Sequence, residues 1–338
     1  FPSSQDTAPP GAPRPLPMKL QHLSSGSPAF ERRVWVYRCV ALSLLSLAAA
    51  AYPSLDASLS RWWGWARQTW FVRLDSFEPI VATLGFGLPI LAFRLLDRHP
   101  ATFAPHRTKP PSPNSKPANL APPTHVLYSL FLYLAPLFLF DTLYHRRRLP
   151  EHAPSPLSLA LQVLSSLLLY DFLFFWVHLA MHKLPVLRFM QHGVHHRCKG
   201  DINATEVLRH SLLDGVMQVL VNIVTLNVLQ SHPLSRACHN IVVTYLLAES
   251  HSGYNFAWMP HNMLPFGVYG GGVAHERHHL GGKYHYQQFF TYLDRGFGYV
   301  PGGSEPYHPK SVAVGGLGIV ACCCIAGGLR WHALVYSA

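Results

Sequence analysis

Three short histidine clusters between positions 178 and 279 carry side chains that can bind metal ions. They read HLAMH, HGVHH and HERHH, and they contain His178 and His182, then His192, His195 and His196, and finally His275, His278 and His279. On a helix, residues three and four positions apart share a face, so each cluster is expected to point its imidazoles in one direction. Neutral imidazole is a ligand for iron, zinc, copper and nickel. Eight histidines exceed the four ligands of a tetrahedral zinc ion. The spacing therefore predicts two metal ions held side by side.

A purely structural role is the alternative for such clusters. Two histidines on one helix face often only hydrogen-bond a backbone carbonyl or a neighbouring carboxylate. Here the three clusters recur beside long apolar segments, where polar groups are expensive and usually functional. This repetition favours metal binding over a structural role.

The composition indicates a membrane protein. The chain has 338 residues, of which 13% are charged, and its formal net charge is +11. Its mean hydropathy is +0.14. Because the positive charge accompanies long apolar runs, the basic residues are expected to face anionic lipid headgroups or to set the membrane topology. The sequence shows no nucleic-acid motif, and we expect no nucleic-acid partner.

Apolar segments near the length of about 20 residues that crosses a bilayer recur along the chain. They predict an all-α fold, a multi-pass membrane helix bundle with a cytosol-facing cap built from the histidine clusters. The expected spans are residues 34–52, 77–96, 126–144 and 157–177, with a further candidate at 312–328.

Proline-rich stretches divide the chain into four expected regions. Residues 1–30 are interpreted as a disordered tail, and residues 31–124 as N-terminal membrane segments with a proline-rich loop. Residues 125–300 form the region that contains the histidine clusters, and residues 301–338 form an apolar C-terminal tail.

The apolar stretch 212–248, between the second and third clusters, predicts a helical hairpin. Ser231, His232 and Pro233 break it near its middle. A hairpin returns the chain to the membrane face that it left, so this one brings the two clusters together. His251 follows the return arm and is expected to reach the same place as a further metal ligand. His232, at the turn, is expected on the opposite side of the membrane.

Two more side chains are candidates for an additional ligand or a supporting group. Asp171 shares a helix face with His178 and His182 and can accept a hydrogen bond from a ligand imidazole; pairing with a cation at a helix end is the alternative. His261 is equally compatible with a metal ligand and with a hydrogen-bonding loop residue.

Other histidines and one acid nearby are interpreted as structural. His210, His232 and His239 are expected to have structural roles, and His285 and Asp294 are expected to pack or cap around the site.

These motifs resemble those of a known family. The three clusters, the segment ESHSGYNF and the segment PFGVYGGGVAHERHH are similar to the fatty acid hydroxylase and sterol desaturase superfamily of integral membrane non-haem di-iron enzymes. Within it, HSGYNF followed by PHNMLPFGVYGG looks most like the sterol hydroxylases, with the sterol methyl oxidases next. The resemblance covers roughly residues 125–300 and marks them as a fatty acid hydroxylase-like catalytic domain.

The resemblance implies two iron ions per chain and a set of ligands. One position departs from the family pattern, because Ala274 stands where sterol oxidases often have a histidine directly before the last cluster. His261 is the candidate to compensate. The implied ligands are His178, His182, His192, His195, His196, His251, His275, His278 and His279.

The resemblance also implies the reaction and its partners. The expected activity is the O2-dependent hydroxylation or oxidation of a sterol or fatty-acyl lipid in the endoplasmic reticulum membrane. Oxidation of an unactivated C–H bond requires a metal, so the protein supplies geometry and excludes water. The sequence shows no nucleotide, flavin or haem motif. Electrons are therefore expected from a b-type cytochrome and an NAD(P)H-dependent reductase.

Two other classes of function stay open at this level. A lipid desaturase uses the same metal centre and differs only in where the substrate carbon lies. A non-catalytic histidine-rich membrane protein, such as a metal transporter, would place histidines or acids along the spans to line a path. Most histidines here lie at expected helix ends instead.

Overall fold

Helices dominate the fold. The computed structural model describes residues 27–109, 123–143, 149–197, 202–302 and 313–325. These residues contain helices and two isolated β-bridges but no β-strand. The prediction of an all-α fold is confirmed.

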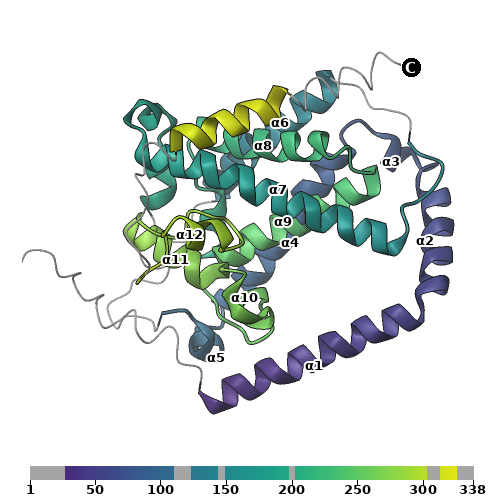
Figure 1. The fold of residues 1–338 in the computed structure, drawn as a ribbon, viewed down its shortest axis with the longest axis horizontal. Helices are drawn as coiled ribbons and strands as arrows, with labels where there is room; N and C mark the ends of the chain where they lie inside the picture. The colour runs from purple at the N-terminus through teal and green to yellow at the C-terminus, as the bar shows by residue number, and fades with distance from the viewer. Residues whose placement is uncertain (1–26, 110–122, 144–148, 198–201, 303–312, 326–338) are drawn as a thin grey trace, which may run out of the picture.

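The elements follow one another from α1 near the N-terminus to a last helix near the C-terminus (Figure 1). The α-helices are α1 (Pro28–Ala50), α2 (Tyr52–Ala66), α3 (Trp70–Arg73), α4 (Phe77–Asp97), α5 (Pro100–Phe103), α6 (Pro123–Leu143), α7 (Pro156–Lys183), α8 (Leu212–Val228), α9 (Pro233–Ser250), α10 (Pro260–Met263), α11 (Gly271–Gly281), α12 (Tyr292–Gly296) and an unlabelled helix, Ala313–Ile325. Short 3-10 helices are η2 (Ala104–His106), η3 (Pro185–Met190), η4 (His192–Arg197), η5 (Ala204–Leu208) and η6 (Pro265–Gly267).

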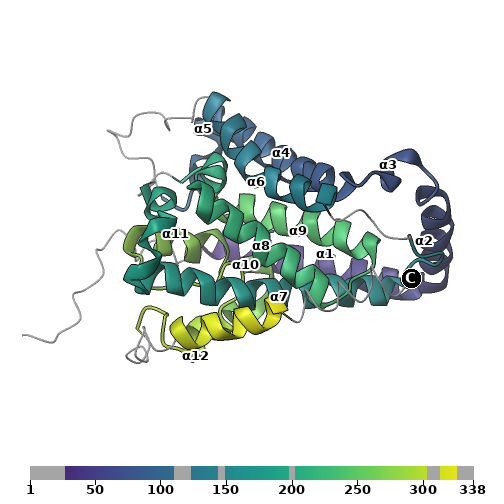
Figure 2. The ribbon, with the colours of Figure 1, turned by 90° about the horizontal axis from the view of Figure 1, so that it is seen from above.

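The long helices α4, α6, α7, α8 and α9 form the body of the bundle. α4 packs along α9 and α6 packs on α8, while α7 contacts both α8 and α9. The α8–α9 pair therefore lies between α7 on one side and α4 with α6 on the other (Figure 2). The core runs through all of these helices, so the expected N-terminal and histidine-bearing regions share one interior. α1 and α2 run along the outside of the bundle (Figure 1).

The predicted helical hairpin is confirmed by α8 and α9. The Ser211 hydroxyl caps the start of α8 by accepting a hydrogen bond from the Asp214 backbone N–H, and Pro233 begins α9. His232 lies between the two arms, where its backbone N–H donates to the Gln162 side chain. His251 follows the last residue of α9. The two histidines thus lie at opposite ends of one helix, as the sequence predicted.

Three of the described helices, α1, α4 and α7, are long and apolar enough to cross a membrane. They correspond to the first, second and fourth predicted spans, so the prediction of several membrane helices is confirmed. Within the expected span 312–328, the structure describes the helix Ala313–Ile325, and residues 312 and 326–328 lie outside the described residues. α1 begins inside the region expected as a tail, with the Ser27 side chain as its cap and Pro28 as its first residue. Residues 1–26 lie outside the described residues.

Candidate metal centre

All nine histidines expected as ligands gather at one end of the bundle. The last two turns of α7 supply His178 and His182, and His251 directly follows α9. These two ends meet because the α8–α9 hairpin returns the chain to the end where α7 stops. η4 and α11 supply the second and third clusters, with their six histidines.

The ligand nitrogens form two groups, and within each group the nitrogens lie within 4.8 Å of one another. The first group has five imidazoles and the second has four. The first is made by His178, His182, His192, His196 and His278, and the second by His195, His251, His275 and His279.

In the first group, three other ligand nitrogens lie close to the Nε2 atom of His196. This atom lies 3.1 Å from Nε2 of His182, 3.1 Å from Nε2 of His192 and 3.2 Å from Nε2 of His278. A metal ion bound by imidazoles at about 2.1 Å places neighbouring ligand nitrogens about 3 Å apart. The spacing of the first group therefore fits a metal ion at its centre.

The second group has the same spacing. The Nε2 atom of His275 lies 2.9 Å from Nε2 of His251 and 3.0 Å from Nε2 of His279. His195 completes the group, with its Nε2 atom 3.3 Å from that of His251. The rings of His196 and His279, one from each group, stack with their centroids 4.6 Å apart. Two ions bound in these groups would be neighbours.

The prediction that each cluster points its imidazoles in one direction is wrong for HGVHH and HERHH. In HGVHH, His192 and His196 belong to the first group while His195 belongs to the second. In HERHH the outer pair belongs to the second group and His278 to the first. The physical reason is that adjacent residues diverge by about 100° on an α-helix and about 120° on a 3-10 helix. The two adjacent histidines that end each cluster therefore serve different groups.

The second nitrogen of several imidazoles is held by a hydrogen bond. Donation from Nδ1 fixes the tautomer and leaves the Nε2 lone pair free for a metal ion. The Nε2 atom of His178 is buried and has no hydrogen-bond partner in the part of the chain that the structure describes. The Nδ1 contacts join His178 to the Tyr286 carbonyl at 2.7 Å, His278 to the Tyr284 carbonyl at 2.7 Å, His251 to the Leu247 carbonyl at 2.8 Å, His195 to the Arg209 carbonyl at 3.2 Å and His192 to the Asp214 carboxylate at 2.9 Å.

Burial favours the neutral form of six of these imidazoles. It lowers the pKa of His196 and of His251 to about 3. Burial first, and then the neighbouring imidazoles, hold the pKa of His195, His275, His278 and His279 well below the usual histidine value. Neutral imidazole is the form that binds a metal ion, so the donor set fits metal binding at neutral pH.

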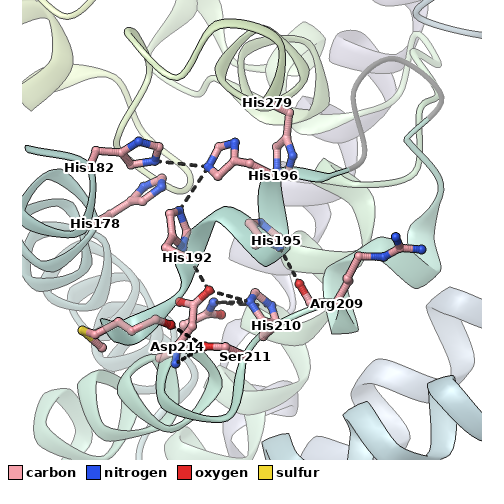
Figure 3. A network of polar contacts seen from close by, with 12 residues as sticks. His178, His182, His192, His195, His196, Arg209, His210, Ser211, Asp214 and His279 are labelled. Atoms are coloured by element: carbon pink, nitrogen blue, oxygen red, sulfur yellow. Dashed lines mark hydrogen bonds and ion pairs between the residues drawn. The ribbon is translucent and has the colours of Figure 1, made fainter. Parts of the chain in front are cut away.

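Asp214 is a supporting residue that the sequence interpretation missed. Its fully buried carboxylate accepts a hydrogen bond from His192 at 2.9 Å and lies 3.2 Å from Nδ1 of His210 (Figure 3). The His210 ring stacks on the ring of His195, with centroids 4.4 Å apart. Asp214 and His210 thus brace one imidazole of each group. An acid in an otherwise apolar arm was the available signal, because such residues are rarely tolerated without a function.

Asp171 does not have the predicted partner. Its carboxylate accepts hydrogen bonds from the Phe289 backbone N–H at 2.7 Å and from the Gln287 side chain at 2.6 Å. The acceptor for His178 is instead the Tyr286 carbonyl. Asp171 therefore acts on the site only through the segment that follows α11. The expectation of a direct contact was wrong because these backbone N–H groups approach Asp171 from a distant part of the chain.

Of the two roles considered for His261, the structure shows the loop contact. Its Nε2 lies 2.9 Å from the Asn255 side-chain oxygen, and its Nδ1 lies 3.4 Å from a Glu249 carboxylate oxygen. It belongs to neither nitrogen group. His261 therefore does not take the place of the histidine that is absent at Ala274.

A small cavity adjoins the histidines on the side of the bundle interior. Phe174, Val207 and Leu247 line it together with imidazoles of both groups. Phe174 and Leu247 each precede a histidine, His178 and His251, by one helical turn. The centre therefore has nitrogen donors on one side and hydrocarbon side chains on the other.

Comparison with known proteins gives a consistent result. Residues 163–299 match the model of the fatty acid hydroxylase family. Human cholesterol 25-hydroxylase is 30% identical over 245 residues, which cover 71% of this chain and 89% of the human protein. A zebrafish cholesterol 25-hydroxylase-like protein is 35% identical over 153 residues, 44% of this chain and 54% of that protein. A Dictyostelium discoideum protein with the provisional name methylsterol monooxygenase is 31% identical over 180 residues, 51% of this chain and 64% of that protein. No solved structure matches this chain significantly.

Proposed function

The chain belongs to the fatty acid hydroxylase family, and on that premise we propose that it is a membrane di-iron oxygenase that hydroxylates or oxidises a sterol or fatty-acyl lipid with O2. The observation that carries the proposal is the pair of adjacent groups of five and four imidazole nitrogens. Family membership favours iron over the other metals that imidazole binds.

The ligands in this proposal are the nine histidines of the two groups. When bound, the iron pair supplies the oxidising power for O2-dependent attack on a C–H bond. The chain's own residues hold the imidazoles neutral and oriented. Phe174 and Leu247 exclude water from the interior side and offer hydrocarbon contacts to a lipid carbon. This arrangement suits a substrate that arrives from the bilayer rather than from water.

A sterol is the preferred substrate class within this proposal. The relatives reported above are named as a cholesterol hydroxylase and a methylsterol monooxygenase. We further propose that the histidine end of the bundle faces the cytosol at the endoplasmic reticulum membrane. A b-type cytochrome and an NAD(P)H-dependent reductase would deliver electrons there.

Two measurements test the proposal. Elemental analysis of purified protein that matured with iron should approach two iron ions per chain. Mass spectrometry of lipids from a host that expresses the chain should show a sterol or acyl lipid with one added oxygen atom. A folded, iron-supplied protein with almost no iron contradicts the di-iron centre. A product that has lost two hydrogen atoms, without added oxygen, would identify a desaturase with the same centre.

A further inference from the structure

A glutamine amide lies unpaired beside the metal centre. Gln288 lines the cavity next to the histidines, and only 6% of its surface is exposed. Its Nε2 atom is buried and has no hydrogen-bond partner among the described residues. A buried donor without a partner destabilises the protein, because it has lost its hydrogen bond to water. The amide is therefore expected to gain an acceptor when the cavity is filled.

The chain on both sides of Gln288 is held by hydrogen bonds, whereas Nε2 of Gln288 has no partner among the described residues. The amide of the preceding Gln287 donates to Asp171 at 2.6 Å, and its oxygen accepts from the Leu293 backbone N–H at 2.6 Å. The following backbone N–H, that of Phe289, also donates to Asp171. These contacts fix the position of Gln288 on both sides. Gln287 thus has a structural role, and Gln288 presents an available donor at a fixed position.

None of the described residues places an acceptor within hydrogen-bond distance of this donor. Phe174, Val207 and Leu247 present only hydrocarbon side chains. An imidazole that binds a metal ion through one nitrogen carries its proton on the other, so neither nitrogen accepts a hydrogen bond. The Gln218 amide, which also lines the cavity, contacts His210 at 3.1 Å. The acceptor must therefore come from outside the protein: a water molecule, for which the cavity volume of about 10 Å³ has room, or a substrate oxygen for which the surrounding side chains move apart.

We propose that Gln288 determines substrate specificity by donating a hydrogen bond from Nε2 to an oxygen atom of the lipid. This inference rests on the proposed lipid oxygenase activity. The hydrocarbon wall receives the carbon that is oxidised, and the amide receives a hydroxyl or carbonyl oxygen close to that carbon. The favoured substrates are lipids whose reacting carbon lies beside an oxygen-bearing carbon. A hydrocarbon tail without oxygen leaves the donor unpaired and binds less well.

Binding of three matched sterols to the iron-loaded protein tests the proposal without turnover. Cholesterol, 5-cholestene (the same hydrocarbon without the hydroxyl) and 25-hydroxycholesterol are titrated without O2 or an electron donor. The wild type should bind cholesterol more tightly than 5-cholestene, or 25-hydroxycholesterol more tightly than cholesterol. In Gln288→Met, which keeps the length of the side chain, this preference should fall about tenfold, the value of one hydrogen bond of about 1.4 kcal/mol. Gln288→Leu, which removes the N–H donor and adds no charge beside the metal-binding histidines, provides a second measurement if the methionine variant does not fold.

Phe174→Leu is the matched control, because it changes the same cavity without changing a hydrogen-bonding group. This variant should weaken the binding of all three sterols by a similar factor, so the ratios of their affinities should not change. A wild type without any hydroxyl preference, or a preference that persists in both Gln288 variants, overturns the proposal. Iron analysis of the same samples reports on the metal centre separately. Two iron ions per chain with an unchanged sterol ratio would therefore refute the role of Gln288 alone.

Discussion

The Asp214 carboxylate links the two nitrogen groups at the level of single residues. It holds Nδ1 of His192, a member of the first group, and it contacts His210, whose ring stacks on His195 of the second. Carboxylates that orient a metal-bound imidazole in this way typically contribute a factor of 10 to 100 to metal affinity.

Asp214→Asn should therefore lower metal affinity by about 10- to 100-fold, because the amide is a weaker acceptor for the His192 N–H. Competition with a chelator of known affinity measures the change. Glu151→Gln is the control, because this carboxylate is exposed and should leave metal retention unchanged. Equal retention by wild type and Asp214→Asn would show that the contact does not support the metal.

At the scale of elements, α9 separates two single histidines by its full length. It has 18 residues, which corresponds to about 27 Å at 1.5 Å per residue. His251 follows its last residue and His232 precedes its first, so the two side chains cannot share a metal ion.

His251→Ala should lower the iron content from about two ions per chain to one or fewer and abolish lipid oxidation, because the second group keeps only three imidazoles. His232→Ala should retain both ions, because that ring contacts the His152 carbonyl at the far end. Elemental analysis at equal protein levels measures both variants. An equal loss of iron in the two variants would contradict the arrangement of α9 relative to the site.

The contact between α4 and α9 depends on a residue without a side chain. A Cβ atom added at Gly85 would collide with Oγ1 of Thr244 and lie 3.3 Å from Cα of Ile241. Oγ1 cannot move freely, because it donates to the Asn240 carbonyl at 2.7 Å.

Gly85→Ala should therefore destabilise the protein by about 1–3 kcal/mol, as other overpacked contacts do. Gly87→Ala, two residues along the same helix, has open space around the new atom and should be neutral or stabilising by up to about 1 kcal/mol. Thermal unfolding of both variants in detergent measures the difference. A Gly85→Ala variant at least as stable as Gly87→Ala would be inconsistent with close packing of α4 on α9.

For the whole molecule, a set of neutral buried imidazoles makes stability depend on pH. His196 and His251 have folded-state pKa values of about 3, whereas histidines of the unfolded chain take up protons below about 6.5. Between these values the unfolded state binds more protons than the folded state, so stability falls as the pH falls.

The metal-free protein should therefore lose stability progressively as the pH drops from about 6.5 toward 3, by about 1.4 kcal/mol per pH unit for each such histidine. Unfolding midpoints in detergent at pH 7.5, 6.0 and 5.0 measure the slope. His251→Ala removes one buried imidazole and should show a shallower slope. A midpoint that rises or stays constant below pH 6.5 would mean that the imidazoles are already protonated in the folded state.

The sequence by itself determined the features that depend on local spacing. Apolar segments of membrane length predicted the helices. The break at Ser231–Pro233 predicted the hairpin and placed His232 and His251 at opposite ends, because helix length follows directly from residue number. The same reasoning brought the second and third histidine clusters and His251 to one end of the bundle.

Only the tertiary structure decided how these side chains are shared. Helix geometry alone makes the adjacent His195 and His196 point in different directions, but which other imidazoles each of them joins depends on the elements that surround η4. Asp171 met backbone N–H groups of Phe289 and Phe290 rather than His178, and Asp214 met His192, because such partners come from segments distant in sequence. Hydrogen bonds between distant segments depend on the packing of whole elements, so spacing along the chain could not predict them.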